Sequence, residues 1–245
     1  MLASAAGAAD AGTFRANIGL DYASGKYGGT ESITQIYLPV SVAYRSDDNW
    51  GLRLTVPYVA VSGPATIIDA NGELVTGPDR SSGGLGDVTL AATLYDVVRN
   101  DAASFYVDLG AKVKLGTASE ADGLGTGKND YSLQADVLKY FDRFALFGTV
   151  GYKWRGDPQG TQLRDVAFAM VGGDYLIGGK TRAGLMFDYR PSSLSGGDAL
   201  QEATFYLSFP SKSNVTIQPY VVAGFSDSSP DWGAGISIGF RHQDM

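Results

Sequence analysis

The chain has 245 residues, a formal net charge of −7 and a composition that is 44% hydrophobic and 18% charged, with 33 glycines, no cysteine and one histidine. The lack of cysteine excludes disulfides and thiolate metal sites, and the negative charge argues against a nucleic-acid partner. A catalytic triad or a multi-histidine metal site would have to use His242, close to the C-terminus. We therefore expect no enzyme, no cofactor and no bound metal.

Residues 1–12 are rich in alanine and glycine and contain no basic residue. We interpret them as a flexible N-terminal segment, either the remnant of a signal peptide or a short periplasmic tail. Residues 13–245 are then expected to form one domain, because a single strand pattern runs through them.

Alternation of apolar and polar residues dominates this domain. Between Ile36 and Tyr44 every second residue is apolar, the turn 46–49 follows, and the alternation resumes from Trp50 to Tyr58. A period of two is typical of a β-strand with one apolar face. The pattern predicts twelve strands, at residues 13–25, 33–45, 49–62, 84–98, 103–116, 130–140, 143–155, 163–176, 180–191, 200–209, 213–226 and 231–242.

The connections between these strands alternate in length. Short ones lie at residues 46–49, 99–102, 142–143, 178–179 and 211–213, and longer ones span 25–32, 63–83, 117–129, 156–162, 191–198 and 226–230. Short periplasmic turns and longer extracellular loops are typical of bacterial outer-membrane barrels with an even number of strands. The sequence therefore predicts an all-β fold, a transmembrane antiparallel up-and-down β-barrel of twelve strands in the outer membrane of a Gram-negative bacterium.

Aromatic residues on the apolar face support this prediction. They gather at both predicted ends of the barrel, as Tyr44 and Trp50 do near the short turns and Tyr152, Trp154 and Trp232 do near the longer loops. Amphipathic rings prefer the headgroup level of a membrane, so this face is expected to contact outer-membrane lipid and lipopolysaccharide. The alternative is a soluble lipocalin-like barrel with the apolar face inward, but such barrels have about eight strands.

Glycine-rich motifs mark the ends of four predicted strands. They are Gly84-Leu85-Gly86-Asp87-Val88, Gly116-Thr117-Ala118, Gly123-Leu124-Gly125-Thr126-Gly127-Lys128-Asn129-Asp130-Tyr131 and Gly151-Tyr152. In this order they resemble the outer-membrane family known as the meta-pathway of phenol degradation, often simply called transporter, over roughly residues 80–242. The resemblance implies an outer-membrane location and uptake of small, often apolar or aromatic compounds. Asp87 is expected to face inward, either accepting hydrogen bonds from inward lysine or arginine or contacting a ligand.

The other face of each predicted strand points into the barrel. The expected pore-lining residues are Arg53, Asp87, Asp108, Lys112, Lys114, Asp136, Lys153, Arg182, Asp188, Arg190, Glu202, Tyr106 and Tyr206. With Arg155 and Asp165, which are also expected to face inward, the two charge signs nearly cancel. Two interpretations stay open: these charges pair into a network that holds the barrel rigid, or they form a polar filter with basic and acidic tracks.

The predicted function is that of a porin-like channel for passive diffusion of small solutes, with aromatic or apolar compounds among the candidates. The alternative is a structural or interaction barrel with a closed lumen, whose loops at residues 63–83 and 117–129 bind a partner. The pattern does not specify an oligomeric state.

Overall fold

The computed structural model describes residues 12–63, 66–68, 74–76, 81–158, 160, 162–211 and 213–243. The expected flexible segment lies outside these residues except for Gly12. Within the described part of the chain, no helix is long and apolar enough to cross a membrane.

The described residues form β-strands in chain order. The strands are β1 (Thr13–Gly25), β2 (Ile33–Arg45), β3 (Trp50–Ser62), β4 (Thr66–Ile68), β5 (Leu74–Thr76), β6 (Ser82–Leu85), β7 (Thr89–Asn100), β8 (Phe105–Lys114), β9 (Asp130–Phe141), β10 (Phe144–Trp154), β11 (Val166–Gly178), β12 (Thr181–Arg190), β13 (Leu200–Pro210), β14 (Val215–Gly224) and β15 (Trp232–Gln243). All pairings between them are antiparallel.

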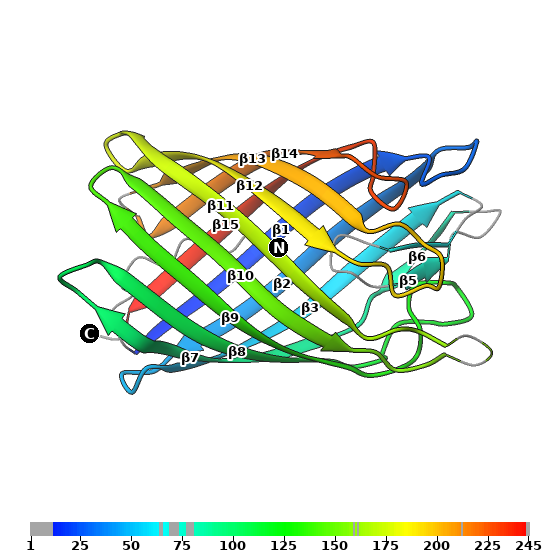
Figure 1. Ribbon diagram of the computed structural model, residues 1–245, viewed down its shortest axis with the longest axis horizontal. Coiled ribbons are helices and arrows are strands. Elements are labelled where there is room, and N and C mark those ends of the chain that lie inside the picture. Colours follow the sequence, from blue (N-terminus) through cyan, green and yellow to red (C-terminus); the bar gives the residue numbers. More distant parts are fainter. Residues whose placement is uncertain are drawn as a thin grey trace.

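The main sheet closes on itself into a barrel whose strands run obliquely to its long axis (Figure 1). In the main sheet consecutive strands pair with each other, except that β6 and β7 both pair with β3, and β1 pairs with β15 to close the cylinder. Because β6 and β7 pair successively along β3, they share one position in the wall, and the described residues give twelve positions. The predicted twelve-stranded antiparallel barrel is thus confirmed, while β4 and β5 form a separate hairpin in the long connection after β3.

The strand predicted at residues 84–98 is interrupted at residues 86–88, and the reason lies in the neighbouring strand. The break faces Pro57 on β3, which has no N–H to donate to the ladder. The Gly86 amide still donates to the Pro57 carbonyl at 2.9 Å, but the Val88 amide donates to Thr117 Oγ1 instead, also at 2.9 Å. One proline therefore divides a continuous predicted strand into β6 and β7.

Five tight turns join strands at one end of the barrel, hereafter the short-turn end, and the longer loops lie at the other, the long-loop end (Figure 1). In each short turn, the described part includes a residue with positive φ. These residues are Asn49, Ser104, Asp142, Gly179 and Asn214. Asparagine, aspartate and glycine tolerate this backbone conformation best, so the local sequence specifies most of the turns.

The outer face of the barrel is a continuous apolar surface. Val150, Val171 and Leu185 are 61%, 60% and 57% exposed, although each lies in the middle of its strand. Aromatic pairs border this surface at both ends, with Tyr44 against Trp50 at the short-turn end and Tyr152 against Trp154 at the long-loop end. An apolar belt between two aromatic girdles is the surface of an outer-membrane barrel, so the lipocalin-like alternative is wrong.

Candidate functional site

The inner wall of β10 to β15 is lined by aromatic rings that lie over glycines of the neighbouring strand. A Cβ atom added to Gly184 on β12 would lie 2.2 Å from the ring of Tyr206, its direct partner on β13. The same arrangement recurs for Gly151 with Phe168, Gly172 with Phe147, and Gly235 with Tyr220. Glycine is needed at these positions because any side chain would displace a ring that packs flat against the wall.

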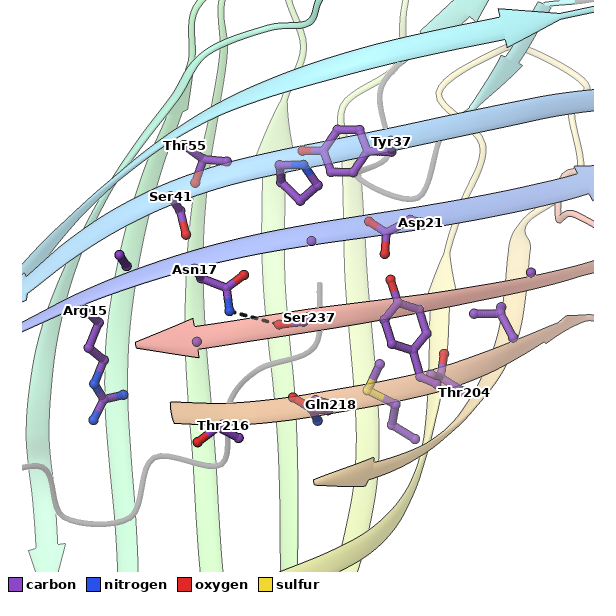
Figure 2. A pocket seen from close by; sticks show the side chains of 18 of the residues that line it. Arg15, Asn17, Asp21, Tyr37, Ser41, Thr55, Thr204, Thr216, Gln218 and Ser237 are labelled. Atoms are coloured by element: carbon purple, nitrogen blue, oxygen red, sulfur yellow. Dashed lines mark hydrogen bonds between the residues drawn. The ribbon is translucent and has the colours of Figure 1, made fainter. Parts of the chain in front are cut away.

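The wall formed by β15, β1 and β2 has mostly small side chains and leaves a cavity of about 490 Å³ (Figure 2). Gly19, Ala23, Ser41, Gly233 and Ser237 line it. The cavity follows β1 over most of its length, because its lining includes side chains near both ends of that strand. One wall carries large rings and the other mostly small side chains. The cavity therefore lies against the wall where β1 pairs with β15.

Hydroxyl, amide and aromatic groups alternate along this cavity. Asn17 Nδ2 donates a hydrogen bond to Ser237 Oγ at 2.9 Å across the β1–β15 pair (Figure 2). Thr55 and Gln218 lie on either side of these two residues, and Tyr37 lies closer to the long loops. The lining offers both polar partners and apolar surface to a small molecule.

Four of the predicted pore-lining residues line this cavity, namely Arg53, Asp188, Arg190 and Glu202. Arg190 Nη2 lies 3.4 Å from Asp188 Oδ1, so two of these charges form an ion pair at the long-loop end. Arg53 is at the opposite end, near the start of β3.

Four other predicted pore-lining residues point into the barrel but are buried and do not line the cavity. Lys114, Tyr206, Asp87 and Lys153 are 2%, 3%, 7% and 7% exposed. Tyr206 is buried because its hydroxyl donates to Asp174 Oδ2 at 3.1 Å while its ring covers Gly184. Neighbouring side chains and the loop between β8 and β9 cover these four residues, so their pore-lining role stays a prediction.

Lys114 and Asp87 belong to a buried charge network at the long-loop end. Lys114 Nζ lies 2.7 Å from Asp87 Oδ2 and 3.4 Å from Asp130 Oδ2, and Arg155 Nη1 lies 3.3 Å from the same Asp130 oxygen. Lys114 also donates to Thr126 Oγ1 at 3.3 Å. The network connects β8, β9 and the end of β10 to the loop between β8 and β9. For these residues the structure agrees with the interpretation that the inward charges pair into a network that holds the barrel rigid.

The remaining predicted pore-lining residues are partly buried against the wall of β8 to β12 and do not line the cavity either. They are Tyr106, Asp108, Lys112, Asp136 and Arg182. Asp108 accepts a hydrogen bond from the Asp96 amide at 2.8 Å, and Arg182 forms an ion pair with Asp174. Asp165 is not inward: it is exposed, lies in the loop before β11 and accepts a hydrogen bond from the Arg155 amide at 2.9 Å.

The loop between β8 and β9 folds onto the inner wall at the long-loop end. Leu124 and Ala118 are 4% and 6% exposed, and they pack with Ile33, Val59 and Val61 of β2 and β3. The Ala118 amide donates to Asp87 Oδ1 at 2.9 Å, which joins this apolar cluster to the buried charge network. The loop is therefore held in place on that wall rather than projecting freely from the barrel.

Comparison of the sequence with known protein families gives a match. The family model described as "Putative MetA-pathway of phenol degradation" matches residues 8–187. The chain belongs to this family. No curated protein matches the sequence.

The fold of this phenol-degradation family member is similar to solved outer-membrane channels. The crystal structure of the COG4313 outer membrane channel from Pseudomonas putida F1 has a TM-score of 0.74 and 14% identity, covering 96% of this chain and 97% of that chain. The NanC porin has a TM-score of 0.60 and 10% identity over 94% and 100% of the two chains. The CymD monoaromatic hydrocarbon channel has a TM-score of 0.52 and 10% identity over 96% and 89%. The protein is a β-barrel of the bacterial outer membrane.

Three of the four motifs that carry the family resemblance, at residues 84–88, 116–118 and 123–131, lie together in space. Asp87 and Ala118 are hydrogen-bonded, and a Cβ on Gly125 would lie 2.8 Å from the Ala118 side chain and 3.0 Å from Asp87 Oδ2. A Cβ on Gly116 would lie 2.4 Å from the Gly127 backbone. The glycines thus allow the close packing of the loop around the buried charge network, and these three motifs support the network rather than line the cavity.

Residues of β1 and β15 that line the cavity were missed by sequence reasoning. Arg15, Asn17, Asp21 and Arg241 all line it. The period of two in residues 13–25 contains the needed signal, because Phe14 and its alternate residues are exposed on the outer face. Asp130 and Asp174 were also missed. Asp130 is only the first residue of the predicted strand 130–140, and glycines at 172 and 173 obscure the alternation of β11 around Asp174.

Proposed function

We propose that this barrel is an outer-membrane channel through which small solutes, including those with an apolar or aromatic part, diffuse passively. The observation that carries this proposal is the cavity of about 490 Å³ that follows β1 between the two ends of the barrel. Its size lies within the roughly 300–1,000 Å³ typical of sites for small organic molecules. Family membership and the similarity to outer-membrane channels support the same function.

The lining suits a small molecule with an apolar part. Tyr37, Pro39, Tyr220 and Val222 contribute apolar or aromatic surface, and hydroxyl and amide groups lie between them. The structurally similar CymD is a monoaromatic hydrocarbon channel, which favours this solute class. Passage requires only weak interactions that a solute can leave again, and this mixed lining provides such interactions. Arg53, Asp188, Arg190 and Glu202 are the predicted pore residues that we place along the path.

The apolar belt outside the barrel supports a second part of the proposal, that outer-membrane lipid surrounds the protein and that lipopolysaccharide contacts its long-loop end. Tyr152 and Trp154 lie in the aromatic girdle at that end. Rings of this kind anchor a barrel at the headgroup level.

Solute uptake into proteoliposomes tests the channel function. N-acetylphenylalanine amide, a small neutral aromatic solute, is expected to enter faster than sucrose and faster than into protein-free liposomes. Ser237→Trp places a large ring in the cavity and is expected to reduce uptake strongly. Ile236→Trp is the matched control, because Ile236 is exposed on the outer face next to Ser237. If wild-type proteoliposomes are no more permeable than protein-free ones, the interaction barrel with a closed lumen becomes the better proposal.

A further inference from the structure

The charges that line the cavity are sorted along its length. At the short-turn end the lining contains Arg15, Arg53 and Arg241, and Lys180 adds a fourth cation. Among the described residues, the acidic side chains in the lining are Asp21, Asp188 and Glu202, and each lies toward the long-loop end of its strand, together with Arg190. Although the inward positive and negative charges nearly balance in number, the short-turn end of the cavity is therefore strongly basic.

The barrel register brings the three arginines together. Arg15 on β1 is directly opposite Arg241 on β15 and directly opposite Ala43 on β2, which in turn pairs with Arg53 on β3. With neighbouring strands about 4.8 Å apart, the row of four positions spans roughly 15 Å. Like charges directly opposite each other in a sheet repel.

A nearby arginine, Arg45, has its charge neutralised by an ion pair. Arg45 Nη2 lies 3.3 Å from Asp96 Oδ2, and its guanidinium stacks on the Tyr95 ring at 4.0 Å. In contrast, Arg15 Nε is buried and has no hydrogen-bond partner among the described residues, and Arg53 is exposed to the cavity. A buried guanidinium donor among like charges is costly unless an anion binds to it.

We propose that Arg15, Arg53 and Arg241 form an anion-binding site at the short-turn end of the cavity, for the carboxylate of a small organic solute. The proposal rests on the proposed channel function and specifies its solute class. Guanidinium groups bind carboxylates through paired hydrogen bonds, and several arginines along a row allow the anion to pass from one to the next. Short turns lie on the periplasmic side of outer-membrane barrels, so this site is where an inward-moving solute leaves the channel.

Hydroxyl and amide groups in the next inward row extend the site toward the centre of the cavity. Asn17, Ser41 and Thr55 occupy this row on β1, β2 and β3, and all of them line the cavity (Figure 2). They offer neutral hydrogen-bond partners to a carboxylate that has not yet reached the arginines. Closer to the long-loop end, Tyr37 and Pro39 of β2 provide surface for the apolar part of the same solute.

Ion selectivity in planar bilayers tests the charge at this end. In a KCl gradient near 0.01 M, where screening extends over about 30 Å, the wild type is expected to prefer chloride over potassium. Replacing the three arginines one at a time with glutamine is expected to lower this preference about threefold for each charge removed, from Coulomb's law at about 7 Å in water. Asp21→Asn, a lining charge of opposite sign, is expected to shift selectivity toward chloride. Arg143→Gln is the control, because Arg143 lies at the same end but stacks on Tyr175 and does not line the cavity.

A pair of solutes of equal shape tests the organic part of the proposal. N-acetylphenylalanine carries a carboxylate where its amide carries a neutral group of the same size. The wild type is expected to take up the carboxylate faster than the amide, and the ratio is expected to fall at least about tenfold in Arg15→Gln/Arg53→Gln/Arg241→Gln. An equal ratio in both proteins, with both solutes passing, overturns the anion site but leaves the channel function standing. If neither solute enters through the wild type, the channel function itself fails.

Discussion

Removing the charge of Lys114 is expected to destabilise the barrel strongly. Its Nζ lies 2.7 Å from Asp87 Oδ2 and 3.4 Å from Asp130 Oδ2, and its side chain is 2% exposed. Each attraction amounts to about 5–6 kcal/mol at an effective dielectric constant of about 20, and much of it offsets the cost of removing these charges from water. Lys114→Met leaves the buried carboxylates of Asp87 and Asp130 without the cation that they share, so the free energy of unfolding is expected to fall by about 3–5 kcal/mol.

Urea titration in phospholipid vesicles, followed by tryptophan fluorescence, measures this loss. Lys112→Met is the matched control, since Lys112 is one inward position away on β8 and is partly exposed. It is expected to cost about 1 kcal/mol or less. Adding Asp87→Asn to Lys114→Met removes one of the two buried negative charges and is expected to recover part of the loss. Equal destabilisation by the two single lysine substitutions would refute the structural role assigned to the network.

Three further predictions concern the fold. In detergent the protein is expected to give a β-rich circular dichroism spectrum and to migrate anomalously in electrophoresis unless boiled, and a helix-rich spectrum contradicts the barrel. Leu109→Arg, on the lipid face near the middle of β8, is expected to cost about 2–4 kcal/mol of stability in vesicles, whereas Lys112→Ala costs less; equal costs would mean that the strand faces are assigned wrongly. Gly184→Ala forces the Tyr206 ring to move and is expected to cost about 1–3 kcal/mol. Gly178→Ala serves as the control in the same urea titration, because a Cβ added there meets no described atom within 4 Å apart from the adjacent residues.

The strands were predictable because a membrane barrel imposes its pattern locally. Each strand must present apolar side chains to lipid at every second position, so a window of about ten residues contains the signal. The predicted limits of the first two strands, 13–25 and 33–45, match β1 and β2. The break at residues 86–88 was not predictable from its own segment, because its cause is the missing N–H of Pro57 on the facing strand.

The alternation also determined which face of each strand points inward, and with it the inward direction of Arg53, Lys114 and Asp87. It did not determine which inward residues reach open space. That depends on ring size across strands, as where Tyr206 covers Gly184, and on the loop that seals Lys114 from the cavity. Such packing brings together residues that are far apart in the sequence, so the local alternation of residues cannot predict it.

The basic end of the cavity is the clearest case of what only the tertiary structure decided. The sequence alone specifies that β1 and β15 are amphipathic strands, and Arg15 and Arg241 occupy their polar faces. These residues lie at opposite ends of the chain, and they become direct neighbours only because the sheet closes with one particular register. A shift of that register by one residue would turn one arginine toward lipid, so barrel closure, which follows from the pairing of every strand edge, creates the charge cluster.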